Sequence, residues 1–106
     1  MKYISTRDNT KEYNFEQVFI KGLADDGGLY VPKTLKKFSA EELIKLKNLN
    51  YNALSAEIIS LFLEDFISKE ELSSLINKSY STFREKEVVK ISNVGEIKLL
   101  ELFHGP

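Results

Sequence analysis

A recurring helix-start pattern constrains the fold of this chain more than any other feature of its sequence. Each copy consists of an apolar residue, a capping side chain, a Gln or Glu three positions further on, and a second apolar residue. The copies span Tyr13–Val18, Phe38–Leu43 and Ile67–Leu72. The capping oxygen accepts a hydrogen bond from a free N–H near the helix start, and the Gln or Glu accepts one from the N–H of the capping residue. The pattern predicts helices that begin near residues 15, 40 and 69, with each cap contributing about 1 kcal/mol.

The extents of the helices follow from glycine and from apolar spacing. The first helix is predicted to end at Gly22, because glycine is favoured just after a helix. A further helix is predicted within residues 52–67, where Asn52 is the expected cap and a wide apolar arc favours central burial. The last helix is predicted to end before Arg84. The second and last helices carry apolar side chains spaced three and four residues apart. These are Leu43, Ile44, Leu46 and Leu49, followed by Leu72, Leu75, Ile76 and Tyr80.

Four short segments have the composition of strands. Residues 2–6 and 28–32 are β-leaning, and Pro32 stops the second of them. Residues 87–92 and 96–103 are predicted to be two strands around a turn at Asn93 to Gly95. We therefore expect an α/β chain with about four helices against a small sheet of three or four short strands. The last strand is the most apolar, and composition leaves open whether it is a genuine edge strand or part of a longer protein.

Length and composition indicate one domain and exclude several classes of function. The chain has 106 residues, of which 42% are hydrophobic, so a real core is expected in a single domain over residues 1–106. Its net charge of −1 lacks the basic excess that nucleic-acid binding requires. The absence of cysteine excludes disulfides and thiolate chemistry. No apolar run approaches the roughly 20 residues that span a bilayer, and the start lacks a signal peptide. A cytoplasmic protein is predicted, without a membrane partner.

The acidic stretch at Asp25 and Asp26 can be interpreted as a ligand loop or as a turn. A calcium loop needs alternating oxygen ligands and a Glu at its twelfth position, but the twelfth residue from Asp25 is Lys36. A phosphate cradle needs a glycine-rich loop that opens a helix, whereas Gly27 and Gly28 precede a strand. We therefore expect a connecting turn, in which one glycine has a positive φ and an Asp side chain accepts from the turn amides.

No self-contained active site can be derived from the residues alone. His104 is the only histidine, and it lacks partners at the spacing of metal ligands, so no metal site is expected. A triad of the Ser/His/Asp type cannot be argued from one histidine. The segment Ser5 to Arg7 is compatible with anion binding or with an ordinary exposed strand end.

Four segments together resemble threonine synthases. They are YISTRD at residues 3–8, GLADDGGLYVP at 22–32, FSAEEL at 38–43 and LELFHGP at 100–106, and they occur here in the family's order. The family usually has STRG near the start, and Asp8 stands here in place of that glycine. The resemblance implies the N-terminal domain of a fold-type II pyridoxal-phosphate enzyme.

The resemblance also implies a reaction and a cofactor for the longer protein. Threonine synthases convert O-phosphohomoserine and water into threonine and phosphate, using pyridoxal phosphate held as a Schiff base by a lysine. That lysine is expected shortly after Pro106, so no catalytic residue is expected within residues 1–106. His104 and Gly105 are the candidate cofactor-binding residues, with Pro106 setting a bend beside them.

Three further expectations concern the chain on its own. Residues 1–106 should bind no cofactor, should be inactive, and should self-associate through an exposed apolar face. Two alternatives remain open: an interaction module with a free strand edge, and a regulatory paralogue that lacks the lysine. The sequence downstream of Pro106 distinguishes both from an enzyme.

Overall fold

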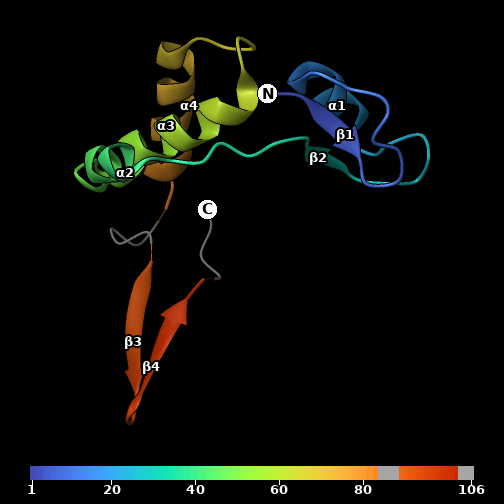
Figure 1. The fold of residues 1–106 in the computed structure, drawn as a ribbon. Helices are drawn as coiled ribbons and strands as arrows, with labels where there is room; N and C mark the ends of the chain where they lie inside the picture. The colour runs from blue at the N-terminus through green and yellow to red at the C-terminus, as the bar shows by residue number, and fades with distance from the viewer. Residues whose placement is uncertain (84–88, 103–106) are drawn as a thin grey trace.

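The computed structural model describes residues 1–83 and 89–102, which form four helices and two antiparallel strand pairs (Figure 1). In chain order these elements are β1 Tyr3–Ser5, α1 Phe15–Lys21, β2 Tyr30–Pro32, α2 Ala40–Lys47, α3 Tyr51–Leu63, α4 Lys69–Ser81, β3 Lys90–Val94 and β4 Ile97–Glu101. The expected class is confirmed, with the strands of the described residues arranged in two separate pairs rather than in one sheet. None of the described helices has the length and apolar character needed to cross a membrane.

The three predicted capping boxes are all present. The side chains of Asn14, Ser39 and Ser68 each accept a hydrogen bond from the backbone N–H three residues later. In return, the backbone N–H of each capping residue donates to the Gln or Glu side chain at that later position. The predicted end of α1 is also confirmed, since Gly22 follows it with a φ of 75°. The fourth cap was predicted at the wrong residue, because Asn50 caps α3 by accepting from the N–H of Ala53 at 2.9 Å.

Asn52 lies inside α3 and serves a different purpose there. Its side-chain amide donates to Oδ1 of Asn77 on α4 at 2.8 Å. Both Asn50 and Asn52 are chemically suited to cap a helix. The contact with α4, which is 25 residues away in sequence, is not visible in the local pattern that led to the wrong cap.

The core lies between α3 and α4. Ala56 and Leu63 of α3 and Leu72 and Ile76 of α4 form its buried cluster. Phe15, Ile67 and Tyr80 are partly buried and pack against this cluster. Leu75 shares the predicted apolar stripe of α4 but is 55% exposed. The predicted central helix therefore does contribute to the core, but its partner buries a narrower face than the spacing suggested.

The N-terminal strand pair forms a second unit with α1. Strand β1 runs antiparallel to β2, with Tyr3 opposite Pro32 and Ser5 opposite Tyr30. Tyr3 also exchanges backbone hydrogen bonds with Tyr13, at 2.9 Å in each direction. Figure 1 shows this unit on one side of the helices, joined to α2 by an extended segment.

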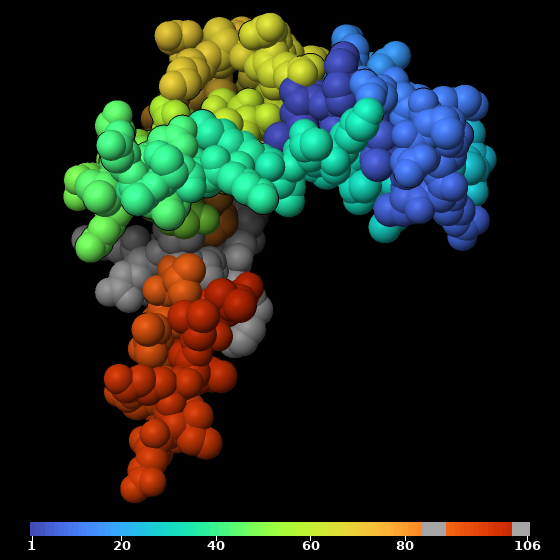
Figure 2. Space-filling view, viewed as in Figure 1, coloured from blue at the N-terminus to red at the C-terminus, as the bar shows by residue number. Residues whose placement is uncertain are grey.

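The strands β3 and β4 form a hairpin that projects from the helical body (Figure 1, Figure 2). The turn was predicted at Asn93 to Gly95, but Asn93 and Val94 remain paired with Lys98 and Ile97. Only Gly95 and Glu96 form the turn, and Gly95 has a φ of 63°. A glycine at the first central position suits a two-residue hairpin turn. The predicted start of β3 at residues 87 and 88 lies outside the described residues.

The overall dimensions show how far the molecule departs from a compact shape. The radius of gyration is 17.2 Å and the extents are 50 × 31 × 31 Å. A compact domain of this length has a radius of gyration of about 13 Å. The difference reflects the projecting hairpin and the side-by-side placement of the two other units (Figure 2).

The cap of α4 provides a test of this architecture. Ser68→Ala removes the hydroxyl that accepts from the N–H of Glu71 at 3.1 Å. We expect a loss of about 1 kcal/mol in the free energy of unfolding and a fall of roughly 4 °C in Tm, measured by thermal and urea denaturation. Ser74→Ala, at an exposed position inside the same helix, is the matched control and should have little effect. Equal losses for both variants would contradict a specific role for the cap.

Candidate functional site

The predicted turn of the acidic loop is confirmed in its chemistry. Oδ1 of Asp26 accepts a hydrogen bond from the N–H of Gly28 at 2.8 Å. Gly27 has a φ of 77°, and its N–H donates to the carbonyl of Ala24 at 3.0 Å. The N–H of Ala24 in turn donates to the carbonyl of Gly28 at 3.1 Å. The loop is therefore closed by its own backbone and by one carboxylate.

The end of β1 is fastened to this loop by Ser5, which the sequence suggested to be part of an anion site or of an exposed strand end. The Ser5 hydroxyl donates to Oδ1 of Asp26 at 2.8 Å and accepts from the N–H of Arg7 at 3.1 Å. Ser5 is only 4% exposed. We call Ser5, Arg7 and residues 24–28 the acidic clasp. Because Tyr3 and Ser5 alternate with Ile4 on β1 and are both buried, strand alternation was the signal that could have indicated it.

Thr6 and Arg7 extend the clasp on its exposed side. The guanidinium of Arg7 donates to the backbone carbonyl of Asp26 at 3.1 Å. Thr6 and Leu29 pair through two bonds, from the Thr6 N–H to the Leu29 carbonyl at 2.9 Å and from the Leu29 N–H to the Thr6 hydroxyl at 3.0 Å. The segment considered as a possible anion site thus makes several of its hydrogen bonds to the chain itself.

Position 28 requires glycine because the side chains of Ser5 and Asp26 lie close to its backbone. A Cβ placed on Gly28 would lie 2.3 Å from Oγ of Ser5 and 2.9 Å from Oδ1 of Asp26. No unstrained contact is that short, so any larger residue would push β1 away from the loop. Gly28 therefore sets the distance at which the Ser5 hydroxyl can reach the carboxylate.

The two aspartates have different electrostatic roles. The backbone hydrogen bond from Gly28, followed by the bond from Ser5, lowers the pKa of Asp26 below its usual 3.8. Asp25 instead forms an ion pair with Lys21 at the end of α1. Because the N–H of Gly28 already donates to a carboxylate, the loop is poorly suited to hold a phosphate. Within residues 1–83 and 89–102, no group of three or more His, Cys, Asp or Glu side chains could hold a metal ion.

Asp8, where the family pattern has glycine, closes its own turn. Its Oδ1 accepts from the N–H of Thr10 at 2.9 Å and from the hydroxyl of Thr10 at 2.6 Å. These bonds lower the pKa of the Asp8 carboxyl. The departure from the pattern therefore has a local structural explanation.

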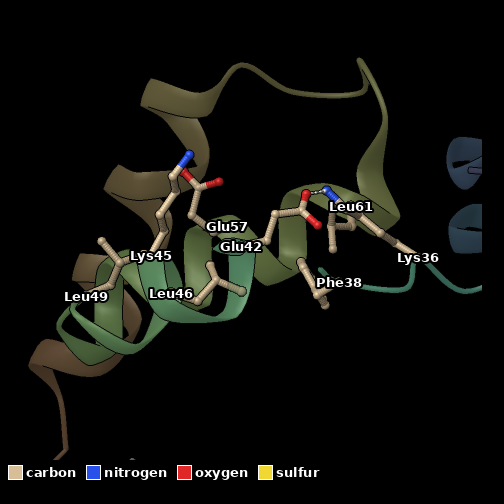
Figure 3. A pocket seen from close by; sticks show the side chains of 8 residues that line it. All are labelled: Lys36, Phe38, Glu42, Lys45, Leu46, Leu49, Glu57 and Leu61. Atoms are coloured by element: carbon tan, nitrogen blue, oxygen red, sulfur yellow. Dashed lines mark ion pairs between the residues drawn. The ribbon is translucent and has the colours of Figure 1, made fainter. Parts of the chain in front are cut away.

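A groove of about 320 Å³ lies between α2 and α3 (Figure 3). Its floor is apolar, with Phe38, Leu46 and Leu61 among its lining residues. The ammonium of Lys36 lies 2.7 Å from a carboxylate oxygen of Glu42 and 5.2 Å from the centre of the Phe38 ring. The amine of Lys36 is held by these contacts. The other charged residues that line the groove are Lys45 and the carboxylates Glu42 and Glu57.

The groove and the acidic clasp can be compared with what pyridoxal phosphate requires. That cofactor needs a reactive amine together with a set of N–H donors for its phosphate. The groove has amines on Lys36 and Lys45 beside two carboxylates, and in the acidic clasp the N–H groups of Ala24, Gly27 and Gly28 already donate within the chain. The candidates His104, Gly105 and Pro106 lie outside the described residues, so their role remains a prediction.

The acidic clasp provides the second test. Asp26→Ala removes the acceptor shared by Ser5 and Gly28, whereas Asp25→Ala removes only a surface ion pair. We expect the first variant to lower Tm distinctly more than the second. Since the folded state lowers the pKa of Asp26, its stabilisation should be present above pH 3.8 and be lost as pH falls through the folded-state pKa. The Tm difference from the unaltered protein should therefore shrink in acid. Equal effects of the two variants, or a difference that does not change with pH, would contradict this assignment.

Comparison with known proteins places the chain in a family. A model of the threonine synthase N terminus matches residues 2–80. Threonine synthase from Schizosaccharomyces pombe is 35% identical over 108 residues, covering 100% of this chain and 21% of that protein. Threonine synthase from Pseudomonas aeruginosa is 37% identical over 107 residues, covering 100% of this chain and 23% of that protein. A crystal structure of pyridoxal-phosphate-bound threonine synthase from Brucella melitensis superposes with a TM-score of 0.86 at 33% identity, covering 100% of this chain and 23% of that one.

The matches cover the whole of this chain but only part of each relative. The chain spans only about a fifth of the length of the relatives it matches. Over that part, the similarity covers the helices, the acidic clasp and the hairpin alike. The chain belongs to the threonine synthase family and corresponds to its N-terminal domain.

Proposed function

We propose that residues 1–106 are one structural domain at the start of a longer, active threonine synthase. That protein would be a pyridoxal-phosphate-dependent carbon–oxygen lyase that converts O-phospho-L-homoserine and water into L-threonine and phosphate. The observation that carries the proposal is the similarity over the whole chain to threonine synthases, one of them solved with the cofactor bound. The interaction-module alternative has no specific observation in its favour, and the paralogue alternative is not favoured over the enzyme.

In this proposal the chain supplies scaffold rather than chemistry. Lys36, one of two lysines that line the groove between α2 and α3, is paired with Glu42. Lys21, beside the acidic clasp, is paired with Asp25. The amine that carries the cofactor would come from the polypeptide after Pro106. His104 and Gly105 would line the edge of the cofactor site, and the longer protein would act in the cytoplasm.

The first test of this function is an activity assay. The full-length protein should release phosphate from O-phospho-L-homoserine when pyridoxal phosphate is present. Replacing the Schiff-base lysine expected shortly after Pro106 by alanine should abolish this release and the cofactor's Schiff-base absorbance. Residues 1–106 alone should release none. Phosphate release by the short chain would contradict the scaffold role. A full-length protein that binds the cofactor but releases no phosphate would contradict the proposed reaction.

A second test concerns His104. In the full-length protein, His104→Ala should reduce kcat/KM or cofactor affinity by about tenfold, which corresponds to the loss of one hydrogen bond or close contact. Ser74→Ala, on the exposed face of α4, is the control that should leave both unchanged. Unchanged turnover together with unchanged cofactor affinity for His104→Ala would remove His104 from the site.

A further inference from the structure

The hairpin of β3 and β4 carries exposed apolar side chains on both of its faces. Residues that are directly opposite share a face, and successive pairs alternate between faces. Ile91 lies opposite Leu100 and therefore shares one face with it. Val94 lies opposite Ile97, and Leu99 shares their face on the other side of the hairpin. These five side chains are between 44% and 70% exposed.

The apolar areas of the two faces occupy different ends of the hairpin. On the face of Ile91 and Leu100, the pair nearer the turn is Asn93 with Lys98, so the apolar area lies toward the base. On the opposite face, the pair farthest from the turn is Lys90 with Glu101, and the pair of Val94 with Ile97 lies next to the turn. We call these areas the base patch (Ile91, Leu100) and the tip patch (Val94, Ile97, Leu99).

A hairpin of this kind requires cover on both sides. A lone two-stranded hairpin is marginally stable in water, and packing against further strands or helices is needed to hold it. Strands with one solvated face alternate polar and apolar residues, whereas strands covered on both faces carry apolar residues on both. The hairpin carries apolar residues on both faces, and each face also has one polar pair. In Figure 2 the hairpin projects away from the helical body.

A second copy of the chain would cover less of the hairpin than two further layers of polypeptide would. A closed two-fold dimer joins the same patch of each subunit. Such a dimer would cover either the base patch or the tip patch and leave the other in water. Covering both patches requires polypeptide on opposite sides of the hairpin.

We propose that the hairpin inserts between two layers formed by the polypeptide that follows residue 106 in the full-length protein. This inference rests on the proposed function, which makes the chain the first part of a longer enzyme. The relatives contain much further polypeptide that could form these layers, because the chain accounts for only 21% to 23% of their lengths. One layer covers the base patch and the other covers the tip patch, so the hairpin anchors the N-terminal domain to the rest of the enzyme.

Hydrogen exchange of residues 90–101 tests the insertion directly. Amides of the hairpin should exchange at least about 100-fold more slowly in the full-length protein than in the 1–106 chain, because docking removes local opening. Equal exchange in the two proteins would overturn the proposal. Slow exchange in the short chain only at concentrations where sedimentation shows an oligomer, combined with fast exchange in the full-length protein, would instead assign the hairpin to a second copy.

Substitutions test the two patches separately. Ile91→Ser with Leu100→Ser alters the base patch, and Val94→Ser with Ile97→Ser alters the tip patch. Each pair should lower the Tm of the full-length protein by about 5 °C or more but leave the helical transition of the 1–106 chain unchanged. Lys98→Ser, at a polar position of the same hairpin, is the matched control and should be neutral in both proteins. A loss for only one pair would show cover on a single face and would overturn the two-layer arrangement.

These readouts are independent of turnover. A full-length protein with a protected hairpin and no phosphate release would refute the proposed reaction while supporting the insertion. Phosphate release with an exposed hairpin would do the reverse.

Discussion

The hydroxyl of Tyr3 joins the two main parts of this structure. It donates to the carbonyl of Phe62 near the end of α3 at 2.8 Å, where the last carbonyls of a helix lack partners within the helix. The Tyr3 backbone is paired with Tyr13, and its ring lies 6.3 Å from that of Phe15. Burial of Tyr3 raises the pKa of its hydroxyl, which keeps the donor proton in place. One side chain therefore ties β1 to both α1 and α3.

The acidic clasp depends on the same strand. Once Tyr3 is buried, strand alternation directs Ser5 to the same side of β1, where it reaches Asp26 across Gly28. The acidic sequence that suggests a ligand loop is thus an internal fastening, in which the carboxylate accepts from Ser5 and Gly28. Its ionised form is favoured by those donors. This explains why a motif that is specific for the family carries no visible chemistry within the described residues.

Local interactions could be predicted from the sequence, and distant ones could not. The caps at Asn14, Ser39 and Ser68 and the glycine after α1 depend on residues within one helical turn, and all four are found. The cap of α3 is local as well, because Asn50 accepts from Ala53, but Asn52 has the same capping chemistry and only its tertiary contact with Asn77 separates the two. The role of Ser5 could not be predicted, since its partner lies 21 residues away. The resemblance supplied what spacing could not, namely the cofactor and the reaction, and its candidate His104 lies outside the described residues.

The distribution of apolar side chains connects these local successes to the proposed role of the chain. The buried cluster of α3 and α4 is small, and none of the described side chains is less than 2% exposed. Large apolar side chains are exposed on both strands of the hairpin and also on the helices, among them Phe19, Ile20 and Leu43. A sequence that depended only on its own core for stability would place such residues inside. Here the caps stabilise the helices locally, and the Tyr3 hydroxyl and the acidic clasp join segments that are distant in sequence. The hairpin leaves apolar side chains on both of its faces for the two further layers that we propose.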